Sequence, residues 1–405
     1  MTDEIRDAAP PRDGAAVPAA DDHASLSDAE QVALRHAVDI ARHGPAHGPN
    51  PQVGCVILSR DGLVLSSGFH RGAGTPHAEV VALAGARTSG ADVRGATAVV
   101  SLEPCHHTGL TPPCSLALLD AGIARVVYAV ADPNDAAAGG AAHLRSSGVD
   151  VVGPVGGHDA LELVRRWSTA VVRDRPFVTL KIASSLDGRI AAADGTSRWI
   201  TGEVARRHAH ELRSEVDAIV IGTGTALVDN PSLTARTASG ELTAHQPLRV
   251  VVGHRDVPGD AALHGPGGEL VPIATHDPAV VLAQLAARDV RHVLVEGGPT
   301  LAAAFCRASL VDEVHAYVAP VLLGAGRSAV EDLGLTTISQ ALRLETREVH
   351  RLGPDVLLVA TPAPATRTPG APAAPAEPQP GASHPSGPTV ATTSSAPGPT
   401  TTTEV

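Results

Sequence analysis

The sequence predicts an α/β protein of two domains, and three features of the chain support this. A length of 405 residues exceeds the size of most single domains. From Val53 to Val152, short runs rich in Val and Ile alternate with helical patterns, as expected for a sheet covered by helices. After Asp174-Arg175-Pro176 a new apolar strand begins, so we place the domain boundary there.

The first domain is expected to begin and end with a helix. Ser27 can cap the first helix, and Glu30 supplies the carboxylate that completes a capping box. A helix over 158–173 would close the domain. Between these helices we expect a mixed sheet with helices on its faces. Its strands are predicted at 53–59, 64–68, 96–101, 125–131 and 149–152.

We place the first domain at 25–174 and the second at 175–362. Residues 1–24 are acidic, rich in Ala and Pro, and show no periodicity, which predicts a disordered leader. Residues 363–405 are rich in Pro, Ala and Thr and lack the large apolar side chains that build a core. A disordered tail is therefore expected at the C-terminus.

One histidine and two cysteines match the ligand set of a catalytic zinc. His77 lies at the predicted start of a helix, Cys105 follows an apolar strand, and Cys114 opens another helix. Three protein ligands leave the fourth position of a tetrahedral zinc open for water, as catalytic sites do. Glu79, two residues after His77, can take a proton from that water and pass it to a leaving amine.

These residues could also serve roles that involve no catalytic zinc. A lone His-Ala-Glu on a helix is usually a solvated face, and a structural zinc would use a closed set of ligands. Glu79 argues against the structural zinc, because a closed site has no need of a neighbouring carboxylate. Four cysteines could also form two disulfides, but Cys55 and Cys306 lie in apolar segments. With no secretion signal and no apolar run near 18 residues, we expect a cytoplasmic protein outside the membrane.

The spacing of the cysteines points to one family of zinc deaminases. Nucleobase deaminases carry His-x-Glu and then Pro-Cys-x-x-Cys, but here eight residues, 106–113, separate Cys105 from Cys114. That long loop, rich in His, Gly, Thr and Pro, resembles the loop of the bifunctional deaminase–reductase family of riboflavin biosynthesis. The resemblance covers roughly 27–360, in matching order. Further matching stretches are 49–55, 68–70, 131–134, 184–188, 197–201, 218–225, 229–236, 295–301 and 317–320.

This resemblance implies a fold and an activity. The fold would be a cytidine-deaminase-like three-layer α/β/α domain followed by a dihydrofolate-reductase-like α/β domain. The enzyme would deaminate 2,5-diamino-6-(5-phosphoribosylamino)pyrimidin-4(3H)-one with zinc. It would then use NADPH to reduce the ribosyl group, giving 5-amino-6-(5-phosphoribitylamino)uracil. The resemblance also implies a homo-oligomer, either a dimer or a tetramer.

By motif position, the resemblance assigns roles to residues in both domains. Asn50 would hydrogen-bond the pyrimidine of the deaminase substrate. The residues that would bind the nicotinamide cofactor are Ala183, Trp199, Thr225, Asp229, Gly298, Pro299, Thr300 and Leu301. The residues that would bind the reductase substrate are Lys181, Ser197, Arg213, Leu233, Arg236 and Glu296.

The chemistry of several residue types is consistent with part of this second site. Backbone amides at the Gly297-Gly298 turn can hold a pyrophosphate, although such a turn alone is a weak signal and no Rossmann fingerprint is present. Arginines such as Arg213 offer planar, paired donors to a phosphate, and the alternative is an ordinary surface arginine. Lys181, the only lysine, is expected at the end of a strand facing this cleft. It would polarise or protonate the substrate, and the alternative is a structural cation on an edge strand.

Two positions depart from the family pattern in ways that bear on function. Gly253-His254-Arg255 stands where many relatives carry Asp-Ser near the adenosine of the cofactor, and we expect Arg255 to contact a 2′-phosphate. Leu110 replaces a basic residue common in the loop between the cysteines. One contact to the substrate phosphate is therefore expected to be missing or supplied elsewhere.

Two alternative functions use the same features differently. A nucleoside or tRNA deaminase with an unrelated second domain would keep the zinc chemistry. The cysteine spacing, the net charge of −12 and the lack of basic, aromatic-rich segments argue against that and against any nucleic-acid partner. Alternatively, the second domain would be a non-catalytic binding module. Binding of NADPH to a fragment covering 175–362 would distinguish that possibility from a reductase.

Overall fold

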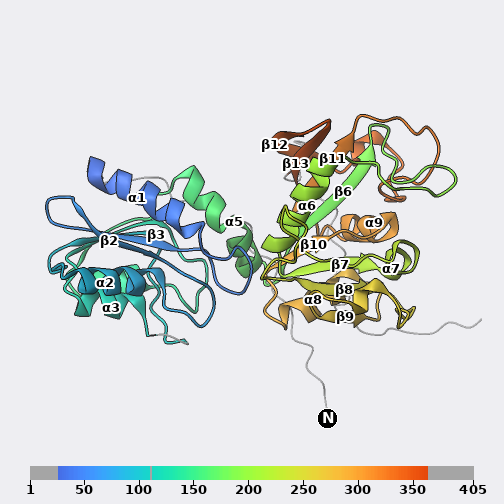
Figure 1. Cartoon of the computed structure of the whole chain (residues 1–405). Helices are drawn as coiled ribbons and strands as arrows, with labels where there is room; N and C mark the ends of the chain where they lie inside the picture. The colour runs from blue at the N-terminus through green and yellow to red at the C-terminus, as the bar shows by residue number, and fades with distance from the viewer. Residues whose placement is uncertain (1–25, 110–111, 364–405) are drawn as a thin grey trace, which may run out of the picture. The chain divides into compact units, whose positions relative to one another are not determined.

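The computed structural model describes residues 26–109 and 112–363. In these ranges the chain forms two α/β domains, each built on its own mixed sheet (Figure 1). This confirms the predicted fold class. The predicted leader and the predicted tail from residue 364 onward lie outside the described residues. Within the described ranges, no helix is long and apolar enough to cross a membrane.

The first domain contains a sheet with the strand order β2-β1-β3-β4-β5. β1 pairs antiparallel with β2 and β3, whereas β3, β4 and β5 run parallel. The strands are β1 (Gly54–Leu58), β2 (Val64–Phe69), β3 (Thr97–Leu102), β4 (Arg125–Val130) and β5 (Asp150–Val152). The helices are α1 (Asp28–Ala41), α2 (Ala78–Ser89), α3 (Cys114–Asp120), α4 (Gly140–Ser146) and α5 (His158–Val172). The predicted strands are confirmed to within a residue at each end.

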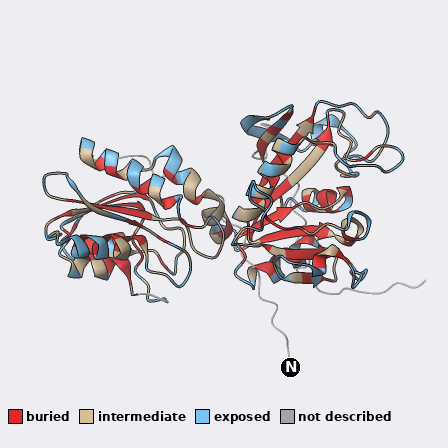
Figure 2. Cartoon of the chain, viewed as in Figure 1, coloured by how far each residue is buried: buried red, intermediate tan, exposed pale blue. Residues whose placement is uncertain are grey.

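Strand β1 shows how helices cover both faces of this sheet. Every residue of β1 is buried (Figure 2). Cys55 and Ile57 pack with residues of α2 and α3, whereas Val56 and Leu58 pack with residues of α1. Successive side chains of a strand point to opposite faces, so a strand covered on both sides has an uninterrupted apolar sequence. The result is the predicted three-layer α/β/α arrangement.

The capping box predicted for the first helix is confirmed at α1. Ser27 Oγ accepts a hydrogen bond from the Glu30 amide at 3.2 Å, and Glu30 Oε2 accepts from the Ser27 amide at 2.8 Å. Glu30 also accepts from Arg125 Nε of β4 at 2.6 Å. One carboxylate thus caps the helix and ties it to the sheet.

The second domain contains a larger sheet with the strand order β12-β13-β11-β6-β10-β7-β8-β9. Strands from β11 to β9 in this order are parallel, and β13 and β12 complete one edge antiparallel. The strands are β6 (Phe177–Ser185), β7 (Ala218–Gly222), β8 (Leu248–Val252), β9 (Leu270–Ile273), β10 (His292–Val295), β11 (Glu313–Ala319), β12 (Leu344–Leu352) and β13 (Asp355–Pro362). The helices are α6 (Glu203–Glu215), α7 (Thr223–Asp229), α8 (Pro278–Ala286) and α9 (Pro299–Arg307), with short 3-10 helices at Ala262–His264 and Ile338–Gln340.

Helices cover both faces of the central parallel strands of this sheet as well. Val220 of β7 packs in a core with residues of α8 and α9, whereas Ile219 and Ile221 pack with residues of α6 and α7. β6 extends to Ser185, so Lys181 lies in the middle of a central strand. The expectation that Lys181 ends a strand, and its alternative as a cation on an edge strand, are therefore wrong. Pairing with β11 extends the strand to Ser185, and β10 pairs with its first four residues on the other side.

Candidate active sites

His77, Cys105 and Cys114 meet at one end of the first sheet. His77 is the N-cap of α2, Cys105 follows β3, and Cys114 is the first residue of α3. His77 Nδ1 lies 3.2 Å from Cys114 Sγ and 3.5 Å from Cys105 Sγ. With Zn–N near 2.0 Å and Zn–S near 2.3 Å, nitrogen and sulfur ligands of a tetrahedral zinc stand about 3.5 Å apart. The three residues therefore fit a zinc ion.

The two thiols and Glu79 are electrostatically linked. The hydrogen bond between the two thiols lowers the pKa of Cys105 to about 4 and raises the pKa of Cys114, so a single negative charge is favoured on Cys105. Zinc binds cysteine as the thiolate. Burial raises the pKa of Glu79. A carboxyl group that both accepts and donates a proton near neutral pH works best with such a raised pKa.

Close packing of α2 against β2 sets the position of His77 and Glu79. Glu79 lies in the first turn of α2 and is only 3% exposed. A Cβ at Gly68 of β2 would come within 2.6 Å of the Ala82 amide nitrogen. Only glycine at position 68 lets the helix approach this closely, and this approach holds the first turn of α2 at the sheet.

The zinc ligands and Glu79 border a cavity of about 340 Å³, and Asn50 lines the same cavity. Asn50 Nδ2 donates to His70 Nε2 at 3.0 Å, and His70 Nδ1 lies 3.2 Å from the Pro76 carbonyl oxygen. Because that oxygen only accepts, the proton of His70 is on Nδ1. These bonds orient the Asn50 amide and leave its Oδ1 as an acceptor for a ligand.

Sequence reasoning missed several polar residues of this cavity. For His70 and the stretch 131–134, the sequence gives a family resemblance but no role. Glu103 accepts hydrogen bonds from three backbone amides of 132–141 and thereby holds that loop. Burial raises the pKa of Asp132 to about 6. The polar residues that line the cavity without having been predicted are His70, Thr75, Glu103, His107, Asp132, Asn134, Trp167 and Arg291.

A cavity of about 640 Å³ in the second domain brings together many of its predicted residues. Those that line it are Lys181, Ala183, Ser197, Trp199, Arg213, Asp229, Leu233 and Arg236. Arg206, which was not predicted, lies over the Trp199 ring with its guanidinium carbon 4.5 Å from the ring centre. This contact holds the exposed indole, which lines the cavity.

Glu296 joins two of the predicted cations beside this cavity. Arg213 Nε and Nη2 donate to its two carboxylate oxygens at 2.7 and 2.8 Å, and Lys181 Nζ lies 3.7 Å from Oε2. Burial alone would raise the pKa of Glu296, but Arg213 and Lys181 outweigh it and lower the pKa to about 2. Arg213 Nη1 also donates to the Thr234 carbonyl. Two of the five guanidinium N–H groups therefore remain for a phosphate.

The remaining predicted cofactor residues surround the glycine turn after β10. Thr225 Oγ1 accepts a hydrogen bond from the Gly298 amide at 3.0 Å, which links the turn to α7. A Cβ at Gly297 would come within 2.5 Å of Leu301 Cδ2, so a larger residue would require the Leu301 side chain to shift. Pro299 and Thr300 begin α9, and the Leu301 side chain is buried in the core. Thr225, Gly298, Pro299, Thr300 and Leu301 do not line the 640 Å³ cavity among the described residues, and their cofactor role stays a prediction.

The fold and the two sites define a class of protein, a zinc-dependent deaminase domain joined to a reductase domain. Residues 27–130 match the cytidine and deoxycytidylate deaminase zinc-binding region, and residues 176–358 match the RibD C-terminal domain. The chain is 46% identical over 335 residues to riboflavin biosynthesis protein RibD of Mycobacterium tuberculosis, strain H37Rv. That match covers 82% of this chain and 96% of the relative. The chain belongs to the RibD family of bifunctional deaminase–reductases of riboflavin biosynthesis.

Solved structures agree with this assignment. The diaminohydroxyphosphoribosylaminopyrimidine deaminase/5-amino-6-(5-phosphoribosylamino)uracil reductase of Thermotoga maritima aligns with a TM-score of 0.75 and 33% identity. The alignment covers 83% of this chain and 99% of that one. RibD of Acinetobacter baumannii aligns with a TM-score of 0.76, 35% identity and the same coverage. Because these relatives match over both domains, a nucleoside or tRNA deaminase with an unrelated second domain is set aside.

Proposed function

We propose that this protein deaminates 2,5-diamino-6-(5-phosphoribosylamino)pyrimidin-4(3H)-one and then reduces the product to 5-amino-6-(5-phosphoribitylamino)uracil. The observation that carries the proposal is the buried Glu79 beside the triad of His77, Cys105 and Cys114, in a cavity that also presents Asn50. The reductase step is supported by the cationic cavity of the second domain. The substrate class is supported by the printed name of the Thermotoga relative.

In the first step, this chain's residues move a proton and orient the ring. His77, Cys105 and Cys114 would hold the zinc, which would supply a nucleophilic water near neutral pH. Glu79 takes a proton from the attacking water and delivers it to the 2-amino group as the carbon–nitrogen bond breaks. A carbon–oxygen bond forms, ammonia leaves, and the ring becomes a uracil. Asn50 Oδ1 accepts a hydrogen bond from the pyrimidine and holds it toward Glu79.

In the second step, residues of the second domain bind the sugar phosphate and donate a proton to its ring oxygen. NADPH supplies the hydride that reduces C1 of the ribosyl group. Arg213 and Arg236 bind the phosphate, with Ser197 and the Leu233 backbone as further donors. Lys181 donates the proton that the ring oxygen needs as the ribosyl ring opens to ribityl. Glu296, which holds both Arg213 and Lys181, contacts the substrate hydroxyls.

We also propose a cytoplasmic protein that forms a dimer or a tetramer. All four cysteines are free in the structure, as expected in a reducing compartment. The oligomer is proposed by analogy with the family alone. Sedimentation equilibrium of the purified protein tests it, and a monomer at micromolar concentration contradicts it.

The proposed sequence of reactions is tested with the purified full chain. We expect ammonia release from the phosphoribosylamino pyrimidine, and NADPH oxidation with either that compound or the deaminated uracil. Ammonia release without NADPH oxidation would leave the deaminase in place and make the second domain a binding module.

Lys181→Met is expected to lower reductase turnover by about 10²-fold or more, because the variant cannot donate a proton. The thioether keeps the length of the side chain, so the packing of β6 is retained. Stopped-flow NADPH oxidation with the deaminated uracil measures the effect, and ammonia release serves as the control. Unchanged turnover would show that Lys181 only balances the charge of Glu296.

Arg255→Gln is expected to raise the KM for NADPH about 10-fold and to leave the KM for NADH unchanged. The Arg255 guanidinium lies beside α7, where a Cβ at Gly224 would be 3.4 Å from Nη2. Arg255 is exposed and lies in the loop that follows β8. Thr225 belongs to α7, the same helix that the Arg255 guanidinium approaches. A 2′-phosphate is present only on NADPH. Equal changes for both cofactors, or a wild-type preference for NADH, would contradict this role.

A further inference from the structure

The positive charge that borders the deaminase cavity comes from one arginine of the second domain, Arg291. Three carboxylates, Glu79, Glu103 and Asp132, line this cavity of about 340 Å³. Among its described lining residues, Arg291 is the sole arginine or lysine. Arg291 directly precedes β10, a central strand of the reductase sheet. The loop between the zinc cysteines, 106–113, contains no arginine or lysine.

The Arg291 side chain has no partner within the described part of the chain. Its Nε is buried and makes no hydrogen bond, and no carboxylate there forms an ion pair with its guanidinium. A buried N–H donor without a partner costs free energy, and such groups in native proteins are usually paired. An anionic ligand in the cavity would supply the missing acceptors.

The backbone that carries Arg291 is held in place by hydrogen bonds. Asp217 Oδ2 accepts from the Arg291 and His292 amides, both at 2.8 Å. Asp217 Oδ1 accepts from the Gly48 amide, in the loop that carries Asn50. One carboxylate therefore joins Arg291 to the loop on the opposite side of the domain junction. Trp167 Nε1 of α5 donates to the Pro49 carbonyl at 2.9 Å and holds the same loop.

We propose that Arg291 binds the phosphate of the deaminase substrate, so that the reductase sheet supplies a binding residue to the deaminase site. This inference rests on the proposed substrate, a pyrimidine that carries a ribose phosphate. A phosphate brought among three carboxylates needs a cation to offset their repulsion. The fork of an arginine suits it, since paired N–H groups match phosphate oxygens.

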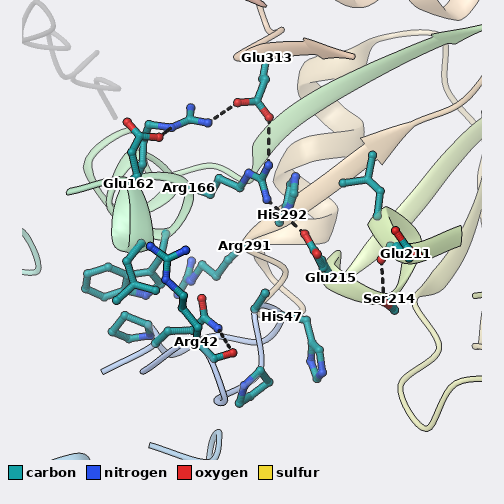
Figure 3. Close-up of a pocket in the computed structure, with 18 of the residues that line it drawn as sticks. Arg42, His47, Glu162, Arg166, Glu211, Ser214, Glu215, Arg291, His292 and Glu313 are labelled. Carbon is teal, nitrogen blue, oxygen red and sulfur yellow. Dashed lines mark hydrogen bonds and ion pairs between the residues drawn. The ribbon is translucent and has the colours of Figure 1, made fainter. Parts of the chain in front are cut away.

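Arg291 also borders a second cavity, of about 670 Å³, together with Asn50, Pro51 and Trp167. Figure 3 shows Arg291 among the side chains of this cavity, with the carboxylates Glu162, Glu215 and Glu313. Glu313 is paired with Arg165 and Arg166, and Glu162 with Arg165 and Arg347. Glu215 lies 3.6 Å from Arg166, so each of these three carboxylates has another arginine as its partner. The alternative is a purely structural role for Arg291 at this junction.

The test compares Arg291→Gln with the wild-type full chain on two substrates, the phosphorylated pyrimidine and the same compound without its phosphate. We expect Arg291→Gln to raise the KM for ammonia release from the phosphorylated compound by about 10- to 100-fold with little change in kcat. On the dephosphorylated compound both proteins should show the same kcat/KM. Arg291→Lys should recover part of the loss, because a lysine keeps the charge but loses the paired geometry.

Arg288→Gln is the matched control. Arg288 lies three positions earlier, is exposed, and pairs with Glu269 outside the cavity. Reduction of the deaminated uracil by each variant shows that the second domain remains folded. Equal losses on both substrates, or no loss on either, would overturn the role of Arg291. A wild-type protein that releases no ammonia from the phosphorylated pyrimidine would overturn the proposed substrate and this role with it.

Discussion

Glu79→Gln is expected to lower ammonia release by about 10²- to 10⁴-fold and to leave reduction of the deaminated uracil unchanged. Glutamine fills the same buried space but cannot accept the proton of the attacking water or deliver one to the leaving amine. The two activities separate because the residues predicted for reduction lie in the second domain, whereas Glu79 lies in the first. Ammonia release and NADPH oxidation, measured on the same preparation, give both values.

Two controls show whether the loss of ammonia release comes from Glu79 itself: the zinc content of the variant and a second carboxylate substitution. His77, Cys105 and Cys114 are unchanged in Glu79→Gln, so metal analysis should find the same zinc content as in the wild type. Asp61→Asn removes an exposed carboxylate in the same domain and should behave like the wild type. Ammonia release that persists in Glu79→Gln at the wild-type rate would assign the proton transfer to another group.

Glu296→Gln is expected to lower the free energy of unfolding by about 3 kcal/mol and to impair reductase activity. Glu296 is the counter-charge of Arg213 and Lys181, which are both largely buried. Without it, two cations remain with no carboxylate partner, and Arg213 loses the bonds that orient it toward the cavity. Denaturant unfolding and NADPH-oxidation kinetics measure the two effects. Glu345→Gln, an exposed change on β12 away from the cavity, is the control.

Acid should reduce the stability difference between Glu296→Gln and the wild type. The pKa of Glu296 in the folded protein is about 2, below its ordinary value of 4.5. A lowered pKa gives stability that is fully present above pH 4.5 and is lost as the pH falls toward about 2. The two proteins should therefore become more alike below pH 4.5. A difference that stays constant down to about pH 3 would mean that packing, and not charge, accounts for it.

Much of the fold and the zinc site follows from local sequence patterns. The uninterrupted apolar run at β1 and the capping residues Ser27 and Glu30 act within a few positions, so the sequence shows them directly. The zinc ligands were also predictable. Each sits at a recognisable boundary of a helix or strand, and the chemistry of zinc restricts the residue types that can hold it.

Residues that act through long-range contacts were harder to predict. The strand of Lys181 was expected to end sooner, and only pairing with β10 and β11 places this lysine inside a central strand. The role of His70 in orienting Asn50 depends on two loops that meet across the end of the sheet. The sequence does not predict Arg291 for the deaminase, because nothing in its local sequence distinguishes it from an ordinary surface arginine.

The sequence by itself therefore determined the α/β class, the strand positions of the first domain, the zinc ligands and the family. Only the tertiary structure decided which side chains share a cavity. Arg213 and Glu296 are 83 positions apart, and Gly48 and Asp217 are 169 apart, yet each pair forms a hydrogen bond. The physical reason is that such contacts depend on how whole sheets and helices pack, which no short-range pattern encodes.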